Sequence, residues 1–191
     1  YTAKFWEYDS RLGRRWNVDP KRKPWNSLYM VNSNNPIWNV DPHGDDEYKV
    51  DKQGNITLIR RTNDEKDILF ATNKEGEIEK SKYIEVKKGI LDKKISGKTE
   101  EGIAYDAYKV RGDEQAKRMF EFLAQHTEVE WSWTQLGEAG SKGLNYLTTS
   151  HEKGAEGGAI ELFKKMFFHG YTVRAHIHSH PGNTPIPSGF N

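Results

Sequence analysis

The chain contains no cysteine, so no disulfide can hold its fold, and any metal ion would be held by histidine, carboxylate or amide side chains. It also has no long hydrophobic run: no segment approaches the roughly 20 apolar residues of a membrane-spanning helix, so we expect no membrane span. The first residues, YTAKFWEYDS, lack the basic-then-apolar order of a secretory signal peptide. Its 191 residues, 35% hydrophobic and 30% charged, are typical of a soluble globular domain with a smaller segment attached.

The chain also lacks a large excess of either charge, because its formal net charge is only +1. The charges are nevertheless unevenly distributed along the sequence. Residues 1–44 carry seven basic and four acidic side chains, and residues 45–112 carry fifteen of each. Residues 113–191 carry seven basic and nine acidic side chains, a net charge of −2. Since surfaces that bind nucleic acid are normally basic, this acidic third argues against a nuclease, and we expect no nucleic-acid partner.

The first part of the chain is rich in aromatic residues and turn signals. Prolines 20, 24, 36 and 42 exclude long helices and favour short strands with tight turns. The stretch YDSRLGRRWNVDP…NNPIWNVDPHG resembles the C-terminal end of the RHS repeat-associated core, because the glycine, both DP pairs and NNPI fall in the order of that family. The resemblance covers about residues 5–44. It implies the tail of a large β-shell, followed by a variable toxin domain.

Residues 46–96 are predicted to form a β-meander. Gly54 and Asn55 lie between two β-branched runs, which is a hairpin signal, and a similar pattern follows in DILFATNKEGEIEKSKYIEVKKG. No catalytic pattern is visible here, so a scaffold or a binding surface is expected. We therefore predict an α+β protein with three parts: an RHS core tail over 1–45, a β-rich spacer over 46–105 and a toxin domain over 106–191.

From about residue 112 the hydrophobic period changes to that of a helix. DEQAKRMFEFLAQH places its apolar side chains on one helical face, and Asp113 can cap its start. TEVEWSWTQLG and GLNYLTTS are predicted as antiparallel strands. A second helix, EGGAIELFKKMFFHG, is expected to bury Ile160, Phe163 and Phe167 and to end at Gly170. The predicted order is helix, strand, strand, helix, strand.

The final predicted strand, YTVRAHIHSH, carries three of the seven histidines. Alternation puts Arg174 and the histidines on one face, and Val173, Ala175 and Ile177 on the other. His178 and His180 are then about 6.6 Å apart along the backbone and can converge on one metal ion, although an exposed polar face would show the same pattern. A catalytic zinc needs three protein ligands, an open position for water and a nearby carboxylate, which no residue after His169 supplies.

The spacing around these histidines is more specific than the histidines alone. H-S-H-P, six residues, and then S-x-x-N match the signature H-x-H-P-x(6)-S-x-x-D of the JAMM metallopeptidases (also called JAB or MPN-plus), except at the last position. The resemblance covers about residues 112–191 and includes the order of the elements. It implies a JAMM/JAB-like, cytidine-deaminase-like fold and a Zn²⁺ cofactor.

The resemblance also implies roles for individual residues. His178 and His180 would bind zinc, and Ser188 would help to stabilise the oxyanion of the tetrahedral intermediate. Asn191 stands where the family has an aspartate as third zinc ligand, and its neutral carbonyl is a poorer ligand. Four explanations stay open: a ligand beyond residue 191 in an incomplete domain, which we favour; an engineered silencing; a natural pseudoenzyme; or substitution by His176.

The family takes its general base from the strand after the first helix. Here that segment offers Glu128 and Glu130, two residues apart and so on one face. Glu130 is preferred because Gly137 follows seven residues later, as a glycine does in the family. Glu128 remains the alternative.

Together these observations predict the C-terminal toxin of a polymorphic RHS-type effector that hydrolyses peptide or isopeptide bonds in a protein or peptide substrate. The resemblance further implies a secreted bacterial effector that acts in the target cell, in its cytoplasm, and a cognate immunity protein. Two alternatives are a metal-free JAMM-like interaction module, favoured by Asn191, and a metal-dependent nuclease toxin, favoured by the histidines and opposed by the acidic charge.

Overall fold

The computed structural model describes residues 46–61, 65–154 and 157–181, and the backbone of three short strands near the N-terminus. The chain forms two compact units, Tyr1–Gly44 and Asp45–Asn191. In the first unit, β1 (Thr2–Ala3), β2 (Trp6–Asp9) and β3 (Arg14–Arg15) form an antiparallel sheet in that order. The remainder of the stretch that resembles the RHS core lies outside the described residues.

The second unit begins with a four-stranded sheet whose order is β5-β4-β6-β7. The two predicted hairpins are confirmed, because β4 pairs with β5 and β6 pairs with β7, both antiparallel. The predicted meander is wrong in one respect: β4 and β6 are parallel neighbours. Alternating burial predicts where each strand lies but not which strands are neighbours. A meander and the observed strand order bury the same side chains. The strands are β4 (Asp46–Val50), β5 (Ile56–Arg60), β6 (Lys66–Thr72) and β7 (Ile78–Lys87).

A five-stranded antiparallel sheet with the order β12-β10-β11-β9-β8 follows. From Asp113 the elements occur in the expected order α1, β10, β11, α2, β12, with a short 3₁₀ turn, η2 (Gly140–Lys142), between β10 and β11. The strands are β8 (Ile95–Lys98), β9 (Ala104–Arg111), β10 (Ser132–Leu136), β11 (Leu144–Thr149) and β12 (Val173–His178), and the helices are α1 (Asp113–His126) and α2 (Gly158–Phe168).

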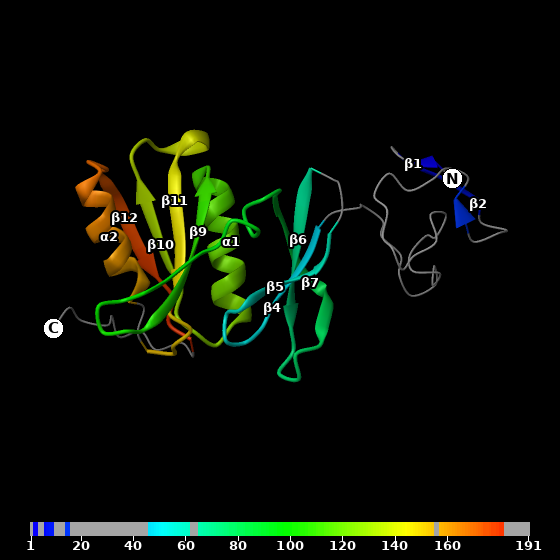
Figure 1. Ribbon diagram of the computed structural model, residues 1–191, viewed down its shortest axis with the longest axis horizontal. Coiled ribbons are helices and arrows are strands. Elements are labelled where there is room, and N and C mark those ends of the chain that lie inside the picture. Colours follow the sequence, from blue (N-terminus) through cyan, green and yellow to red (C-terminus); the bar gives the residue numbers. More distant parts are fainter. Residues whose placement is uncertain are drawn as a thin grey trace. The chain divides into compact units, whose positions relative to one another are not determined.

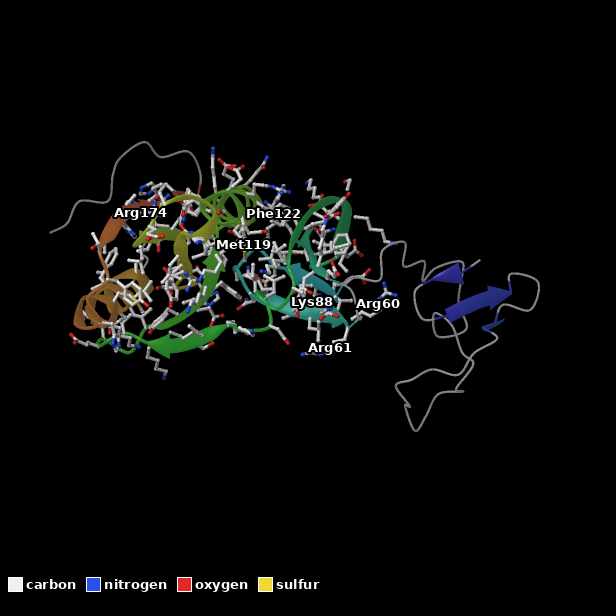
Figure 2. All side chains as sticks on the ribbon, turned by 90° about the horizontal axis from the view of Figure 1, so that it is seen from above. Arg60, Arg61, Lys88, Met119, Phe122 and Arg174 are labelled. Carbon is white, nitrogen blue, oxygen red and sulfur yellow. The ribbon has the colours of Figure 1, made fainter. Side chains whose placement is uncertain are left out.

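Helix α1 lies between the two sheets, and α2 lies on the other face of the five-stranded sheet (Figure 1). One core joins Val50 and Leu69 of the four-stranded sheet, Met119 and Leu123 of α1, and Leu147 of β11, all fully buried. Figure 2 labels Met119 and Phe122 on this helix. Burial of each such side chain stabilises the fold by about 1.5–3 kcal/mol. The predicted boundary at 105/106 falls inside β9, and the segments on its two sides share this core.

The predicted helix over DEQAKRMFEFLAQH is confirmed, but the role expected for Asp113 is wrong. The N-cap residue is Gly112, and no side chain caps the helix. The Asp113 carboxylate instead accepts hydrogen bonds from the Gly140 N–H at 2.8 Å, the Asn145 amide at 3.0 Å and the Arg174 guanidinium at 2.8 Å. Three donors from distant parts of the chain thus take the carboxylate away from the helix end.

Helix α2 is turned relative to the predicted orientation. Ile160 is 50% exposed, so its predicted burial is wrong, while Ala159 and Leu162 are buried. Leu162 packs with Leu136, Leu144 and Tyr146 of the sheet. The side chain of the third predicted core residue, Phe167, lies outside the described part.

The end of α2 is as predicted. Gly170 follows with a φ of +72°, a backbone conformation that glycine adopts without strain. The N–H of Tyr171 donates to the Met166 carbonyl and closes the last turn. Within the described ranges, neither helix combines the length and apolar character needed to cross a bilayer.

Strand β12 contains a bulge that changes which residues share a face. Its register against β10 shifts between Gln135 and Leu136, so that Val173 lies opposite Leu136 and packs against the α2-side cluster. Arg174 turns the other way and donates to Gln135 and Asp113. The expectation that Arg174 shares a face with the histidines is therefore wrong, because strict alternation does not hold through a bulge.

Candidate active site

The histidines lie where β12 runs beside the start of β10. His178 is paired with Ser132 and His176 with Thr134, whose hydroxyl is 3.2 Å from His176 Nδ1. The His176 ring also packs edge-on against Phe163 of α2, with centroids 5.0 Å apart. Burial, and secondarily the neighbouring His178, hold the pKa of His176 below its usual value. His176 is thus a half-enclosed, packed histidine on the α2 side of the sheet.

His178 and His180 face one another at the end of this strand. Their ring centroids are 4.7 Å apart, with an interplanar angle of 67°. Only His178 belongs to β12, because the strand ends there. Ser179 and His180 follow the strand without belonging to it, so the two imidazoles converge across the strand end.

Glu130 lies two residues before β10 and points to these rings. Its side chain is only 5% exposed, and its Oε1 lies 3.3 Å from His180 Nδ1. Of the two candidate bases, Glu130 is the one that the fold brings to the histidines.

Glu128 lies in a bend outside the strand and makes a different contact. Its carboxylate is 42% exposed and accepts a hydrogen bond from Lys153 at 3.2 Å. That hydrogen bond lowers the pKa of Glu128. The two glutamates therefore do not share a face, because the strand to which the pattern assigned them begins only at Ser132.

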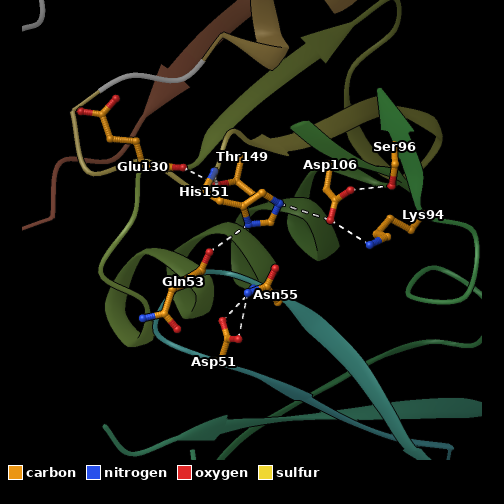
Figure 3. A network of polar contacts seen from close by, with 9 residues as sticks. All are labelled: Asp51, Gln53, Asn55, Lys94, Ser96, Asp106, Glu130, Thr149 and His151. Atoms are coloured by element: carbon orange, nitrogen blue, oxygen red, sulfur yellow. Dashed lines mark hydrogen bonds and ion pairs between the residues drawn. The ribbon is translucent and has the colours of Figure 1, made fainter. Parts of the chain in front are cut away.

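The peptide groups of Glu130 are held by the last residue of β11 and by the loop that follows it. The Glu130 N–H donates to the Glu152 carbonyl at 2.8 Å, and the Thr149 hydroxyl donates to the Glu130 carbonyl at 2.8 Å. Thr149 also accepts a hydrogen bond from the N–H of His151. Figure 3 shows the Glu130 carboxylate pointing away from the His151 ring, so this network holds the backbone while the side chain stays directed at His180.

His151 joins this loop to two other parts of the fold. Its backbone has a φ of +61°, in the left-handed region that a non-glycine residue rarely adopts. Its Nδ1 is 2.9 Å from the Gln53 carbonyl in the β4–β5 loop, and its Nε2 is 3.3 Å from Asp106 in β9 (Figure 3). These contacts compensate for the unfavourable backbone conformation.

Asp106 is the buried carboxylate of this network. Burial acts to raise its pKa, but hydrogen bonds from Ser96 at 2.6 Å and Lys94 at 2.9 Å outweigh burial and hold the pKa below its usual value. Sequence patterns gave no signal for Asp106, Thr149 or His151, because their partners lie in other elements. No sequence motif predicts the positive φ of His151 either.

The donor types at this site fit a zinc ion. Imidazole nitrogens are common zinc ligands in proteins, and His178 and His180 supply two of them, while Glu130 supplies the nearby carboxylate that a zinc-bound water needs. Within the described ranges no group of three histidine, aspartate or glutamate side chains is arranged to hold a metal ion. Ser188 and Asn191 lie outside the described residues. The described part thus provides two imidazoles and an adjacent buried carboxylate.

Comparison with known protein families gives a match in the C-terminal part of the chain. Residues 108–191 match the model of a protein family described as JAB-like toxin 1. No curated protein and no solved structure matches the chain. The match supports a JAB-like toxin domain in the part of the chain that contains His178, His180 and Glu130.

Proposed function

We propose that residues 108–191 form a zinc-dependent peptidase toxin that hydrolyses peptide or isopeptide bonds. The observation that carries this proposal is the convergence of His178, His180 and Glu130 at the end of β12, within the segment that matches the toxin family. Two imidazoles beside a buried carboxylate are the groups that a zinc hydrolase needs for metal binding and proton transfer.

Each residue has a specific role in this proposal. His178 and His180 would hold the zinc ion, with position 191 as the third ligand position of the JAMM family. A bound zinc ion would polarise the scissile carbonyl and make a water molecule more acidic. Glu130, enclosed and adjacent to His180, accepts the proton of that water and delivers it to the leaving amine. Ser188 would stabilise the oxyanion, as its counterpart does in that family.

The biological setting is part of the proposal. The match to a toxin family supports an effector delivered to a target cell, and the RHS-like stretch near the N-terminus supports a polymorphic RHS-type protein. Such a toxin would act in the target cytoplasm and would be made with an immunity protein. The acidic net charge of residues 113–191 favours a protein substrate over a nucleic acid.

The test is toxicity in bacteria together with metal content. His178→Ala is expected to abolish both growth inhibition and zinc binding while the protein stays folded. His169→Ala is the matched control, because His169 is exposed and lies between α2 and the start of β12, whereas His178 ends that strand. Toxicity that persists in a folded, zinc-free His178→Ala protein would exclude the peptidase and favour the metal-free interaction module. Cleavage of plasmid DNA instead of protein would favour the nuclease.

A further inference from the structure

We propose that Ser179, the residue between the two histidines, is a positioning residue that ends the strand pairing and sets His180 against Glu130. Its consequence for catalysis rests on the proposed function, but its structural role does not. The inference follows from how the pairing of β10 and β12 ends.

The ladder between β10 and β12 has an unusual last step. In an antiparallel pair, two hydrogen-bonded residues exchange both of their N–H···O=C bonds. Ser179 donates its N–H to the Trp131 carbonyl at 2.8 Å, as such a ladder requires. The return bond differs: the Trp131 N–H donates to the Ser179 side-chain hydroxyl at 3.0 Å. The hydroxyl thus takes the place of the serine's own carbonyl.

This replacement releases the backbone from the strand at the residue before His180. Because the Ser179 carbonyl is not the acceptor, the chain can leave the strand while the Trp131 N–H keeps a partner. Beyond the end of the strand, the His178 and His180 rings are 4.7 Å apart, closer than the 6.0 Å between the rings of His176 and His178, which both lie in β12. There His180 Nδ1 also lies within 3.3 Å of Glu130.

The same hydrogen bonds fix Glu130 from the other side. Trp131 is fully buried and follows Glu130 directly, so its N–H and carbonyl fix the peptide that precedes β10. Ser179 binds both of these groups. Ser179 therefore determines the positions of two segments. One carries the Glu130 carboxylate, and the other carries the His180 imidazole.

Two substitutions of Ser179 separate the effect of its hydroxyl group from the effect of side-chain size. Ser179→Thr and Ser179→Val have nearly the same shape, but only threonine keeps an acceptor for the Trp131 N–H. Thr72→Val is the matched control, because Thr72 is a buried hydroxyl that donates to the Val50 carbonyl in the other sheet.

The first measurement uses the zinc-free protein. In Ser179→Val, amide hydrogen exchange of Trp131 is expected to become about 5- to 10-fold faster, as the loss of one neutral hydrogen bond predicts. The nuclear Overhauser contacts between the His178 and His180 rings are expected to weaken. Ser179→Thr and Thr72→Val should leave both observables as in the parent protein. Hydrogen exchange of the Leu69 amide, in the other sheet, reports any global loss of structure. Its rate in Ser179→Val should equal that in the parent protein.

The second measurement is zinc affinity by competition with a chelating dye. Ser179→Val is expected to bind zinc about 10- to 100-fold more weakly than Ser179→Thr, the usual effect of removing a group that orients a metal ligand. If the parent protein binds no zinc while the exchange and ring contacts respond as expected, the zinc proposal fails and the positioning role stands. If Ser179→Val keeps slow Trp131 exchange and the ring contacts, the positioning role is overturned, whatever the zinc result.

Discussion

A buried carboxylate is costly unless a charged or hydrogen-bonding partner lies beside it, and Glu130 has His180 as that partner. Glu128 is close in sequence, yet it is half-exposed and bound to Lys153. Two chemically identical side chains thus have different environments, and only Glu130 lies beside the histidines. The choice between them can be tested by matched substitutions.

Glu130→Gln is expected to lower the killing activity by about 10²- to 10⁴-fold, the usual contribution of a general base, while zinc binding persists. Glutamine keeps the size of the side chain but cannot accept the proton. Glu128→Gln is the control and should leave activity nearly unchanged. Growth assays with induced expression and metal analysis of the purified proteins give both results. Equal losses in the two variants would contradict the assignment.

If position 191 is the third ligand position, Asn191→Asp is expected to increase zinc affinity by at least about tenfold, because a carboxylate adds a negative charge where the amide oxygen is neutral. Zinc affinity is measured by dye competition, with Asn183→Asp as a control for added charge in the same segment. If Asn191→Asp leaves the affinity of a folded protein unchanged, position 191 is not a ligand position.

At the scale of elements, the β4–β5 loop supports the segment that carries Glu130. Gly54 has a φ of +79°, and a Cβ placed there would lie 2.9 Å from Val129 Cγ2 and 3.3 Å from the Trp131 ring. The Glu128 N–H donates to the Lys52 carbonyl in the same loop. The loop of the first sheet therefore packs directly against the residues on both sides of Glu130.

Gly54→Ala is expected to destabilise the protein more than Gly76→Ala does. Gly76 has a similar φ of +81°, but a methyl group added there would meet no atom of the described residues within 4 Å, so only backbone strain of about 1–2 kcal/mol applies. At Gly54, steric overlap adds about 1–3 kcal/mol. Urea unfolding of the two variants gives the difference in free energy, and equal values would show that the loop does not pack on Val129 and Trp131.

The Asp106 network predicts a pH dependence of stability. Because the pKa of Asp106 is lowered in the folded state, its contribution is fully present above the unfolded pKa of about 3.9 and is lost as the pH falls toward the folded value. Asp106→Asn is therefore expected to be less stable than the parent protein at pH 7 and to lose less stability below about pH 4. Thermal unfolding between pH 7 and pH 2 measures how the stability of each protein depends on pH. Parallel curves for the two proteins would exclude a stabilising role of ionised Asp106.

At the scale of the whole molecule, two sheets and the helix between them form one core. Met119 and Leu123 of α1 are fully buried in a cluster that includes Val50 and Leu69 of the four-stranded sheet. The four-stranded sheet is therefore a structural part of the unit that carries the candidate site. Residues 1–44 form a separate compact unit.

Two truncations are expected to behave differently. Residues 45–191 should unfold cooperatively at nearly the same temperature as the full chain, because they form a compact unit that contains the core shared by α1 and the two sheets. Residues 106–191 should show no cooperative transition, because they lack the four-stranded sheet against which α1 packs. Calorimetry distinguishes the two, and a cooperative transition of residues 106–191 would show that the shared core is dispensable.

The sequence by itself determined those features that depend on neighbours within a few residues. The helical period over residues 113–126 predicted α1, and Gly54 and Gly170 marked a turn and a helix end, because glycine adopts positive φ without strain. The H-x-H spacing and the surrounding motif were sufficient to single out His178 and His180.

The Gly137 spacing favoured Glu130 over Glu128, but only the tertiary structure showed which glutamate lies beside His180, because that contact spans fifty positions of the chain. The same holds for Arg174, which the bulge in β12 turns to Asp113, and for Ser179, whose hydroxyl contacts the backbone of a residue 48 positions away. The physical reason is common to all three. Hydrogen bonds between distant segments select one of several local conformations that have similar free energy, and no local sequence pattern encodes that selection.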